Sequence, residues 1–489
     1  MALGDRHDGQ RDHHHPDDHP VLPRPETLRQ GHRDHREQGV SFPAGFLWGA
    51  GTSAYQIEGH HGRGESVWDT FCRRPGAVEG GGDGSRACDS YLRWREDVEL
   101  VKELGLRAYR FSTGWSRVMP DGVRPDPKAL DHYERFVDAL LEAGAEPVLT
   151  LNHWDMPAAL TGGWAERATV AAFAAYTEAV AGRLADRVTW WITQNEPWII
   201  ALLGYQLGLH APGVADLGTA VKAGHHVLLG HGAAADVLHA HPGVLAGSAL
   251  SLFPCDPATG SEADRAAATG SDGYVNRWYL DPLLAGGYPA DMRGHWERAL
   301  GHGLDFIQDG DEAAIGGRSD FLGVNYYTRR VMAAAPPAPF PWRVVGPSGD
   351  VARTDEGWEI NAGALRDLLT GLSRRFPRTP LMVTENGGVF GDTPAHDGQV
   401  HDNRRIAFLR DHVAAVGEAI DAGADVRGYL HWSLMDNFEW ALGYRPRFGL
   451  VHVDYATGAR TVKDSGRYYA RLIAGGGAAP ALPRIEAYG

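Results

Sequence analysis

Two glutamates, Glu196 and Glu385, stand where paired carboxylates could hydrolyse a glycosidic bond. Glu196 lies in Thr-Gln-Asn-Glu-Pro at 193–197, and Glu385 lies in Thr-Glu-Asn-Gly at 384–387. Each follows a short apolar run typical of a buried strand, and each precedes turn-forming residues. Glycoside hydrolysis uses two such carboxylates, one as acid/base and one as nucleophile or base. Either motif alone is also typical of a surface turn, so the prediction depends on both together.

Polar and aromatic residues follow most of the other predicted strands. Amides, imidazoles and carboxylates can hydrogen-bond the hydroxyls of a sugar, and a tryptophan ring matches its apolar face. Singly, such residues more often serve a structural role, but seven of the eight predicted strand ends carry one. We therefore predict that the strand ends present Gln56, Glu58, Arg110, His153, Trp154, Asn195, Asn325, Tyr327, Trp432, Glu439 and Trp440 at one mouth. Of these, Gln56, His153, Asn195 and Glu439 suit the hydroxyls of a sugar, and Trp432 and Trp440 suit its ring face.

The elements that position these residues alternate between short strands and amphipathic helices. Strands are predicted near 45–53, 107–112, 146–151, 188–194, 245–252, 320–325, 381–384 and 426–432. Helices are predicted at 90–104, 130–143, 169–185, 215–239, 364–375 and 402–421. This order predicts an α/β chain with one (β/α)8 barrel over residues 40–489, whose active site lies at the carboxyl ends of the strands. The stretches 253–319 and 326–360 exceed ordinary connections and are predicted to be loop insertions that wall a pocket.

Composition and charge narrow the classes of binding partner and the cellular compartment that we expect for this protein. Residues 1–39 are rich in His, Arg, Asp and Pro and poor in apolar residues, which predicts a disordered tail. The net charge of −15 argues against nucleic acid and anionic membranes as partners. The three cysteines are odd in number and are not spaced as metal ligands, so neither a disulfide framework nor a metal site is expected. No apolar run is typical of a membrane span or a signal peptide. We therefore expect a cytoplasmic protein.

Several long motifs resemble those of the family 1 glycoside hydrolases, the β-glucosidase family. Residues 46–59 resemble the N-terminal signature, 384–387 the nucleophile motif and 193–197 the acid/base motif. The resemblance extends over about residues 41 to 475 and also includes the segments 110–112, 153–154, 325–328 and 431–440.

The resemblance implies a role for each matching residue. Glu385 would be the nucleophile and Glu196 the acid/base, with Tyr327 and Arg110 in contact with Glu385. Asn195 would bond the sugar 2-hydroxyl, and Trp432 would lie beneath the ring. Trp358 would be a platform for the leaving group, although residues 361–365 depart from the family pattern beside it. No metal or organic cofactor is expected, and the substrate would be a small β-glucoside or cello-oligosaccharide.

Other activities remain open from the sequence. A 6-phospho-β-glucosidase needs cations near the sugar 6-position and typically carries a small residue where this chain has Glu439, whose carboxylate would repel phosphate. An endo-glucanase, a transglycosidase and a non-catalytic sugar-binding relative are further alternatives. We expect a retaining, exo-acting enzyme on unphosphorylated β-glucosides, with β-fucosides and β-galactosides as secondary substrates.

Overall fold

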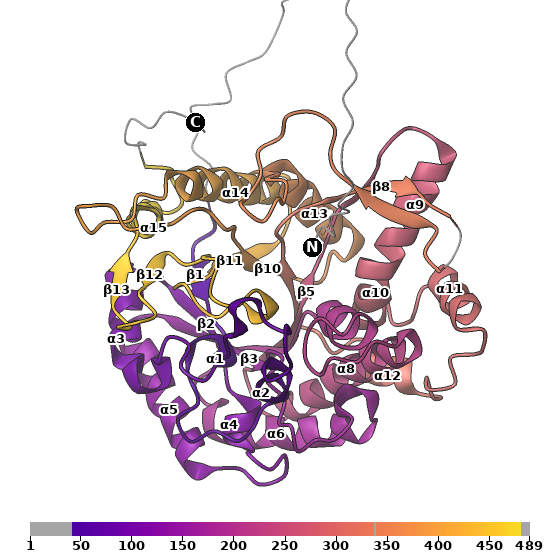
Figure 1. The fold of residues 1–489 in the computed structure, drawn as a ribbon, viewed down its shortest axis with the longest axis horizontal. Coiled ribbons are helices and arrows are strands. Elements are labelled where there is room, and N and C mark those ends of the chain that lie inside the picture. Colours follow the sequence, from indigo (N-terminus) through magenta and orange to yellow (C-terminus); the bar gives the residue numbers. More distant parts are fainter. Residues whose placement is uncertain (1–41, 337–338, 481–489) are drawn as a thin grey trace, which may run out of the picture.

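Eight parallel strands close into a barrel in the computed structural model, which describes residues 42–336 and 339–480 (Figure 1). Their order around the barrel is β1-β11-β10-β7-β5-β4-β3-β2, and β1 pairs with both β2 and β11. The strands are β1 (Leu47–Gly51), β2 (Ala108–Ser112), β3 (Glu146–Asn152), β4 (Trp190–Asn195), β5 (Leu245–Ser251), β7 (Phe321–Asn325), β10 (Leu381–Asn386) and β11 (Val426–Trp432). The predicted (β/α)8 barrel is confirmed. The predicted tail at 1–39 lies outside the described residues.

All six predicted helices are present around the sheet. They are α3 (Ser90–Glu103), α5 (Pro127–Glu142), α6 (Ala168–Leu184), α8 (Leu217–Leu238), α13 (Ala362–Arg375) and α14 (Asn403–Asp421), followed by α15 (Asp464–Ala474). Helix α5 begins earlier than predicted, because the Asp126 side chain accepts the Lys128 amide and Pro127 suits the first helical position. Helix α3 ends before Gly105, whose φ of +64° favours glycine.

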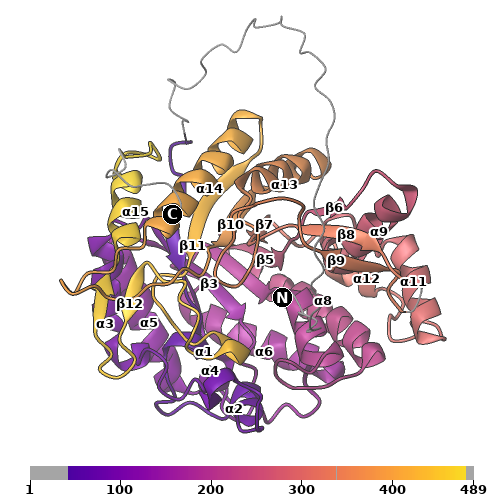
Figure 2. The ribbon, with the colours of Figure 1, turned by 45° about the horizontal axis from the view of Figure 1, so that its top comes forward.

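The two long connections, which the sequence predicts to be loop insertions, carry helices and strands of their own. After β5 come β6 (Cys255–Pro257), α9 (Glu262–Asp272), α10 (Trp278–Leu284), α11 (Ala290–Leu300) and α12 (Asp311–Ile315). After β7 come β8 (Arg330–Ala334) and β9 (Trp342–Val345), and β6, β8 and β9 form a small sheet beside α9 (Figure 2). Apolar residues of α9 pack against Met332 of β8, which explains why this insertion folds.

Shorter elements lie in the remaining connections. They are α1 (Ala54–Ile57), α2 (Val67–Cys72), α4 (Trp115–Val118), α7 (Pro197–Ile199), the hairpin of β12 (Val451–Val453) and β13 (Arg460–Val462), three 3-10 turns at 79–81, 163–165 and 440–442, and two π-helical turns at 200–206 and 273–277. No helix among the described residues is both long enough and apolar enough to cross a membrane.

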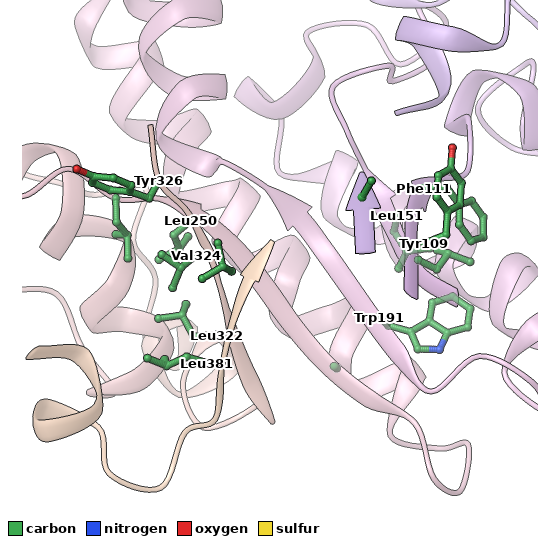
Figure 3. Close-up of a cluster of buried hydrophobic side chains, with 14 of the residues drawn as sticks. Tyr109, Phe111, Leu151, Trp191, Leu250, Leu322, Val324, Tyr326 and Leu381 are labelled. Carbon is green, nitrogen blue, oxygen red and sulfur yellow. The ribbon is translucent and has the colours of Figure 1, made fainter. Parts of the chain in front are cut away.

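The barrel strands divide their side chains between two cores. Outward residues such as Tyr109, Trp191 and Leu322 pack between the sheet and the helices (Figure 3). The inner core takes one buried residue from each of seven strands: Ala108, Val148, Ile192, Ala249, Phe321, Met382 and Leu430. This inner layer is the floor on which the polar site stands.

Strand periodicity carries several predicted site residues to the inner face above that floor. Successive side chains alternate between faces, so Arg110 follows Ala108 inward, and Asn325 and Trp432 lie in phase with Phe321 and Leu430. Glu385 is out of phase with Met382. Strand β10 shifts register against β7 between Val383 and Glu385, and such irregularities re-aim side chains.

Candidate active site

Glu385 is held by two hydrogen-bond donors, one on strand β2 and one on the segment that follows β7. Arg110 Nη1 donates to its Oε1 at 2.6 Å, and the Tyr327 hydroxyl donates to its Oε2 at 2.6 Å. Arg110 is fully buried and Glu385 is 3% exposed, so little water competes for this ion pair. The two donors fix the orientation of the Glu385 carboxyl, and Arg110 places a positive charge directly against it. Burial, followed by the charge of Glu385, raises the pKa of Tyr327 well above its usual value, so its hydroxyl keeps its proton.

Glu196 is a buried carboxyl in a different electrostatic setting. Asn325 Nδ2 donates to its Oε1 at 3.0 Å, and the Ser251 hydroxyl also bonds to it. Burial, followed by the negative charge of Glu385, raises the pKa of Glu196 to about 8. The donors and the Arg110 charge lower that pKa without cancelling the rise. Glu196 therefore carries its proton near neutral pH, as a general acid must.

An unbroken path of hydrogen bonds joins the two glutamates. Asn325 Nδ2 donates to Glu196 and also, at 3.0 Å, to Asn195 Oδ1. Arg110 Nη2 donates to the same Asn195 oxygen at 2.8 Å, while its Nη1 holds Glu385. With its oxygen occupied, the Asn195 amide group points its nitrogen at His153 Nε2, 3.1 Å away. The relative positions of the two carboxyls are thus set by buried side chains of β2, β4 and β7.

A second group of polar residues gathers around Glu439. Gln56 Nε2 donates to Glu439 Oε1 at 3.4 Å and to Asn437 Oδ1 and the Phe438 carbonyl at 2.9 Å each. Burial raises the pKa of Glu439 to about 8, and the charges of Glu385, Asp436 and Glu356 add to that rise. The expectation that Glu439 acts as a carboxylate anion needs correction, because burial among these acidic groups favours its protonated form near neutral pH.

Aromatic rings line the same region. His153 stacks against Trp432 and Trp440, with ring centres 5.6 and 6.1 Å apart. Trp154 packs on Trp440 and donates its indole N–H to the Asn195 carbonyl at 2.9 Å. Trp358 packs against Tyr327 and lies half-buried, farther from the floor. Hydrogen bonds and ring contacts therefore bring the predicted sugar-site residues together around Glu196 and Glu385. Glu58 lies apart, in a buried ion pair with Arg117 at 2.7 Å.

Three of these residues have strained backbones. Trp154, Glu196 and Trp440 have φ values of 78°, 52° and 55°. Left-handed backbone is uncommon for residues other than glycine, and it persists where surrounding contacts enforce it, often at functional sites. At Glu196 the backbone turns directly from β4 into the short helix α7, which presents the carboxyl at the strand end.

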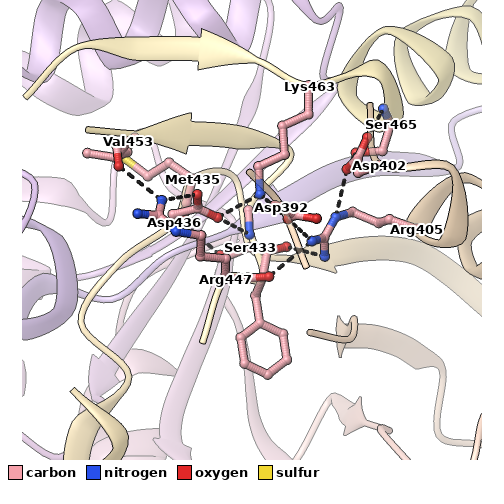
Figure 4. Close-up of polar contacts among 12 residues, drawn as sticks. Asp392, Asp402, Arg405, Ser433, Met435, Asp436, Arg447, Val453, Lys463 and Ser465 are labelled. Atoms are coloured by element: carbon pink, nitrogen blue, oxygen red, sulfur yellow. Dashed lines mark hydrogen bonds and ion pairs between the residues drawn. The ribbon is translucent and has the colours of Figure 1, made fainter. Parts of the chain in front are cut away.

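A buried charge network supports the segments that follow β10 and β11 (Figure 4). Lys463 Nζ contacts both Asp392 and Asp436, at 2.5 and 2.8 Å. Arg405 pairs with Asp392 and donates to the Gly388 carbonyl at 2.6 Å. Asp392 follows the Glu385 segment, and Asp436 precedes Glu439. These cations therefore connect the segment after Glu385 with the segment before Glu439.

Sequence reasoning missed several contributors. Ser251 is the last residue of β5, the one strand end to which no site residue was assigned, and the strand-end rule applied there would have found it. Thr384 donates to Asn325 Oδ1 at 2.6 Å and so fixes which side of that amide faces Glu196. Lys463 and Asp392 had no local signal, because they meet only through the folded chain.

Comparison with known proteins identifies the family. The sequence profile described as glycosyl hydrolase family 1 matches residues 38–478. The chain belongs to glycosyl hydrolase family 1. It is therefore a retaining glycoside hydrolase with a (β/α)8 barrel.

Individual family 1 members resemble the chain over most of its length. A β-glucosidase from Agrobacterium sp. is 42% identical, covering 89% of this chain and 95% of the relative. A bifunctional β-D-glucosidase/β-D-fucosidase from Bifidobacterium breve is 41% identical, covering 88% of this chain and 98% of the relative. The crystal structure of a psychrophilic β-glucosidase from Micrococcus antarcticus superimposes with a TM-score of 0.85 at 44% identity, covering 89% and 98% of the two chains.

Proposed function

We propose that this enzyme is a β-glucosidase that releases terminal, non-reducing β-D-glucosyl residues by double displacement. Glu385 attacks the anomeric carbon, and Glu196 protonates the departing oxygen. The observation that carries the proposal is the contrast between the two carboxyls: Arg110 and Tyr327 hold Glu385, whereas the pKa of Glu196 is raised to about 8. Pairs of carboxyls whose environments separate their pKa values mark acid and nucleophile roles.

The second step follows from the loss of one charge. When Glu385 becomes esterified to the sugar, its negative charge no longer raises the pKa of Glu196. That pKa falls, and Glu196 can then remove a proton from water as the water attacks the anomeric carbon. The Tyr327 and Arg110 donors remain to stabilise the carboxylate that leaves in this step. Transfer to another alcohol uses the same residues.

The sugar ring would lie on Trp432, with its hydroxyls facing Gln56, His153, Asn195, Glu439 and Trp440. The pKa of His153 is lowered well below its usual value by burial and by Arg110, so a neutral imidazole faces the sugar. Its Nδ1 is buried without a hydrogen-bond partner in the described chain, although a buried polar atom ordinarily has one. A sugar hydroxyl would satisfy this atom.

An unphosphorylated sugar suits the site better than a 6-phosphosugar. The charges of Glu385, Asp436 and Glu356 all raise the pKa of Glu439, so the potential around it is negative even when Glu439 is protonated. A phosphate dianion placed there would meet that potential. The reason for excluding phosphate therefore shifts from the charge of Glu439 itself to its acidic surroundings.

Tolerance of β-fucosides is a secondary part of the proposal. The Bifidobacterium breve relative is named for both activities. A fucoside lacks the 6-hydroxyl but keeps the ring that would stack on Trp432. The cytoplasmic location and a role in degrading cello-oligosaccharides stay predictions.

A matched substrate panel tests the proposal. The p-nitrophenyl β-glucoside, β-galactoside, β-fucoside and 6-phospho-β-glucoside would each be assayed with the wild type and with Glu385→Ala as the blank. We expect the β-glucoside to be cleaved and the Glu385→Ala enzyme to be inactive. Release from the 6-phosphate alone would contradict the substrate assignment, and no release from any member would contradict the glucosidase proposal.

A further inference from the structure

Arg330, the first residue of β8, is a cation with aromatic neighbours and no anionic partner in the described part of the chain. Its guanidinium carbon lies 4.8 Å from the ring centre of Trp198 and 4.5 Å from that of Phe253. Within residues 42–336 and 339–480, no carboxylate or hydrogen-bond acceptor pairs with this guanidinium. The preceding residue differs, because Arg329 bonds to Glu359 at 2.7 Å and to Asp256 at 2.8 Å.

The surrounding carboxylates are committed to other cations. Asp256 and Glu359 both pair with Arg329, and Asp272 pairs with Arg277 at 2.8 Å. Burial lowers the pKa of the Arg330 guanidinium, and the titratable groups that act on it are Cys255 and Tyr274, both neutral near pH 7. A half-buried guanidinium left without an anion carries a desolvation cost that an anionic ligand would offset.

Arg330 contacts two segments that adjoin Glu196. Trp198 follows Glu196 by two residues in α7, and Phe253 follows Ser251, whose hydroxyl bonds to Glu196, by two residues. Because an acid/base stands beside the departing oxygen, we infer that these segments and the guanidinium on them border the leaving group. The two aromatic contacts hold the guanidinium there, which reduces the entropy lost when it binds.

We propose that Arg330, held by Trp198 and Phe253, forms a leaving-group subsite that selects β-glucosides of carboxylate-bearing aromatic alcohols. The proposal builds on the proposed β-glucosidase function and specifies its leaving group. The planar guanidinium offers paired N–H donors to a carboxylate, and such charge-assisted pairs are stronger than neutral hydrogen bonds. The adjacent rings of Trp198, Phe253 and Tyr274 favour an aromatic body for the same ligand.

The test compares 4-carboxyphenyl β-glucoside with 4-carbamoylphenyl β-glucoside, which differ in charge at the position that Arg330 would bind. The ratio of kcat/KM for the acid over the amide is measured in the wild type and in Arg330→Gln. Because intrinsic leaving-group reactivity is the same in both enzymes, it cancels between the two ratios. We expect the ratio to fall by about tenfold in Arg330→Gln, as for loss of a charge-assisted hydrogen bond. Arg330→Lys should retain part of the preference.

Arg343→Gln is the matched control. Arg343 is exposed on β9 of the same small sheet, so its substitution makes the same change in net charge and should leave the ratio unchanged. An unchanged ratio in Arg330→Gln would overturn the proposal. An equal loss on both glucosides would also overturn it, because it would indicate a packing role.

A binding measurement separates this inference from the proposed activity. Calorimetric titration with 4-hydroxybenzoate and 4-hydroxybenzamide needs no turnover. We expect Arg330→Gln to weaken binding of the acid by about tenfold and leave the amide unchanged. Equal affinities for acid and amide in the wild type would overturn the subsite. Failure to hydrolyse any glucoside would contradict the proposed function, while the titration would still decide the subsite.

Discussion

The guanidinium of Arg110 contacts Glu385 at 2.6 Å, and its other terminal nitrogen contacts Asn195, the residue before Glu196, at 2.8 Å. A single buried side chain on β2 therefore constrains two strands that carry opposite roles in the proposed mechanism. It forms an ion pair with Glu385, and its charge opposes the rise in the pKa of Glu196. The different environments of Glu385 and Glu196 lead to specific expectations for Glu196 and for its partner Asn325.

Glu196→Ala should separate substrates by the quality of their leaving groups. Glycosylation of the enzyme by 2,4-dinitrophenyl β-glucoside should persist, because that leaving group needs no proton, whereas hydrolysis of cellobiose should fall by roughly 10²–10⁴-fold, the usual contribution of general acid catalysis. Added azide should restore turnover of the dinitrophenyl substrate and form the β-glucosyl azide. Equal losses on both substrates would contradict the acid/base role of Glu196.

The pH dependence of kcat/KM should show an alkaline limb near pH 8. The pKa of Glu196 is raised to about 8, so the free enzyme keeps its acid protonated below that pH and loses it as the pH rises further. The limb should weaken with 2,4-dinitrophenyl β-glucoside, which needs no protonation. Because the pKa of Glu439 is also about 8, the profile of Glu439→Gln serves as the control and should keep the limb for poor leaving groups. A limb lost in Glu439→Gln would assign it to Glu439 instead.

Asn325→Ala should move the alkaline limb upward. Asn325 donates to Glu196 Oε1 and lowers the pKa of that carboxyl, so removing the donor raises the pKa further. The limb for p-nitrophenyl β-glucoside should then appear at higher pH, along with a lower kcat because Asn195 loses a partner. A limb that moves to lower pH would contradict the role of this hydrogen bond.

Glu439→Gln should affect galactosides more than fucosides. A galactoside differs from a fucoside only by its 6-hydroxyl, and we expect Glu439 to bind hydroxyls at that end of the sugar. The ratio of kcat/KM for p-nitrophenyl β-galactoside over β-fucoside should fall by several-fold, consistent with the loss of roughly 1 kcal/mol for one hydrogen bond. An unchanged ratio would place Glu439 away from the 6-position.

Lys463→Met should destabilise the protein and loosen the site. Lys463 is fully buried and contacts Asp392 and Asp436. Without Lys463, Asp392 would still pair with Arg405 and Asp436 with Arg447. Removing one member of a buried charge network typically costs about 3–5 kcal/mol, so the thermal midpoint should drop markedly. Lys102→Met, on the exposed face of α3, is the control and should leave the midpoint unchanged. Equal midpoints for the two variants would contradict a structural role for the network.

The barrel and the residues at the carboxyl ends of its strands could be predicted, because strand ends carry local sequence signals. Glu196, Glu385 and Asn325 each end or follow an apolar run, and parallel strands deliver such residues to one edge. The strand bounds also followed from the apolar runs. Small-sheet formation by β6, β8 and β9 could not be predicted, because short, partly exposed strands in a long insertion pair only through tertiary contacts.

Electrostatics was the part least accessible from sequence. From its sequence alone Glu439 is expected to be an anion, but burial beside three acidic groups favours its protonated form near neutral pH. The Asn325 amide at the end of β7 donates to both Asn195 and Glu196 at the end of β4, and these two strands lie far apart in sequence. Arg329 and Arg330 are adjacent and chemically identical, and only the fold shows that Arg329 pairs with carboxylates whereas Arg330 meets none among residues 42–336 and 339–480.

The measurement that tests the central claim most directly is mass spectrometry of the trapped intermediate. The enzyme would be incubated with 2,4-dinitrophenyl 2-deoxy-2-fluoro-β-glucoside, whose fluorine slows breakdown of a glycosyl-enzyme, and then digested. We predict one fluoroglucosyl group per chain, attached to Glu385 and absent from the Glu385→Ala enzyme. Attachment to another residue, or turnover without any covalent adduct, would contradict the assignment of Glu385 as the nucleophile.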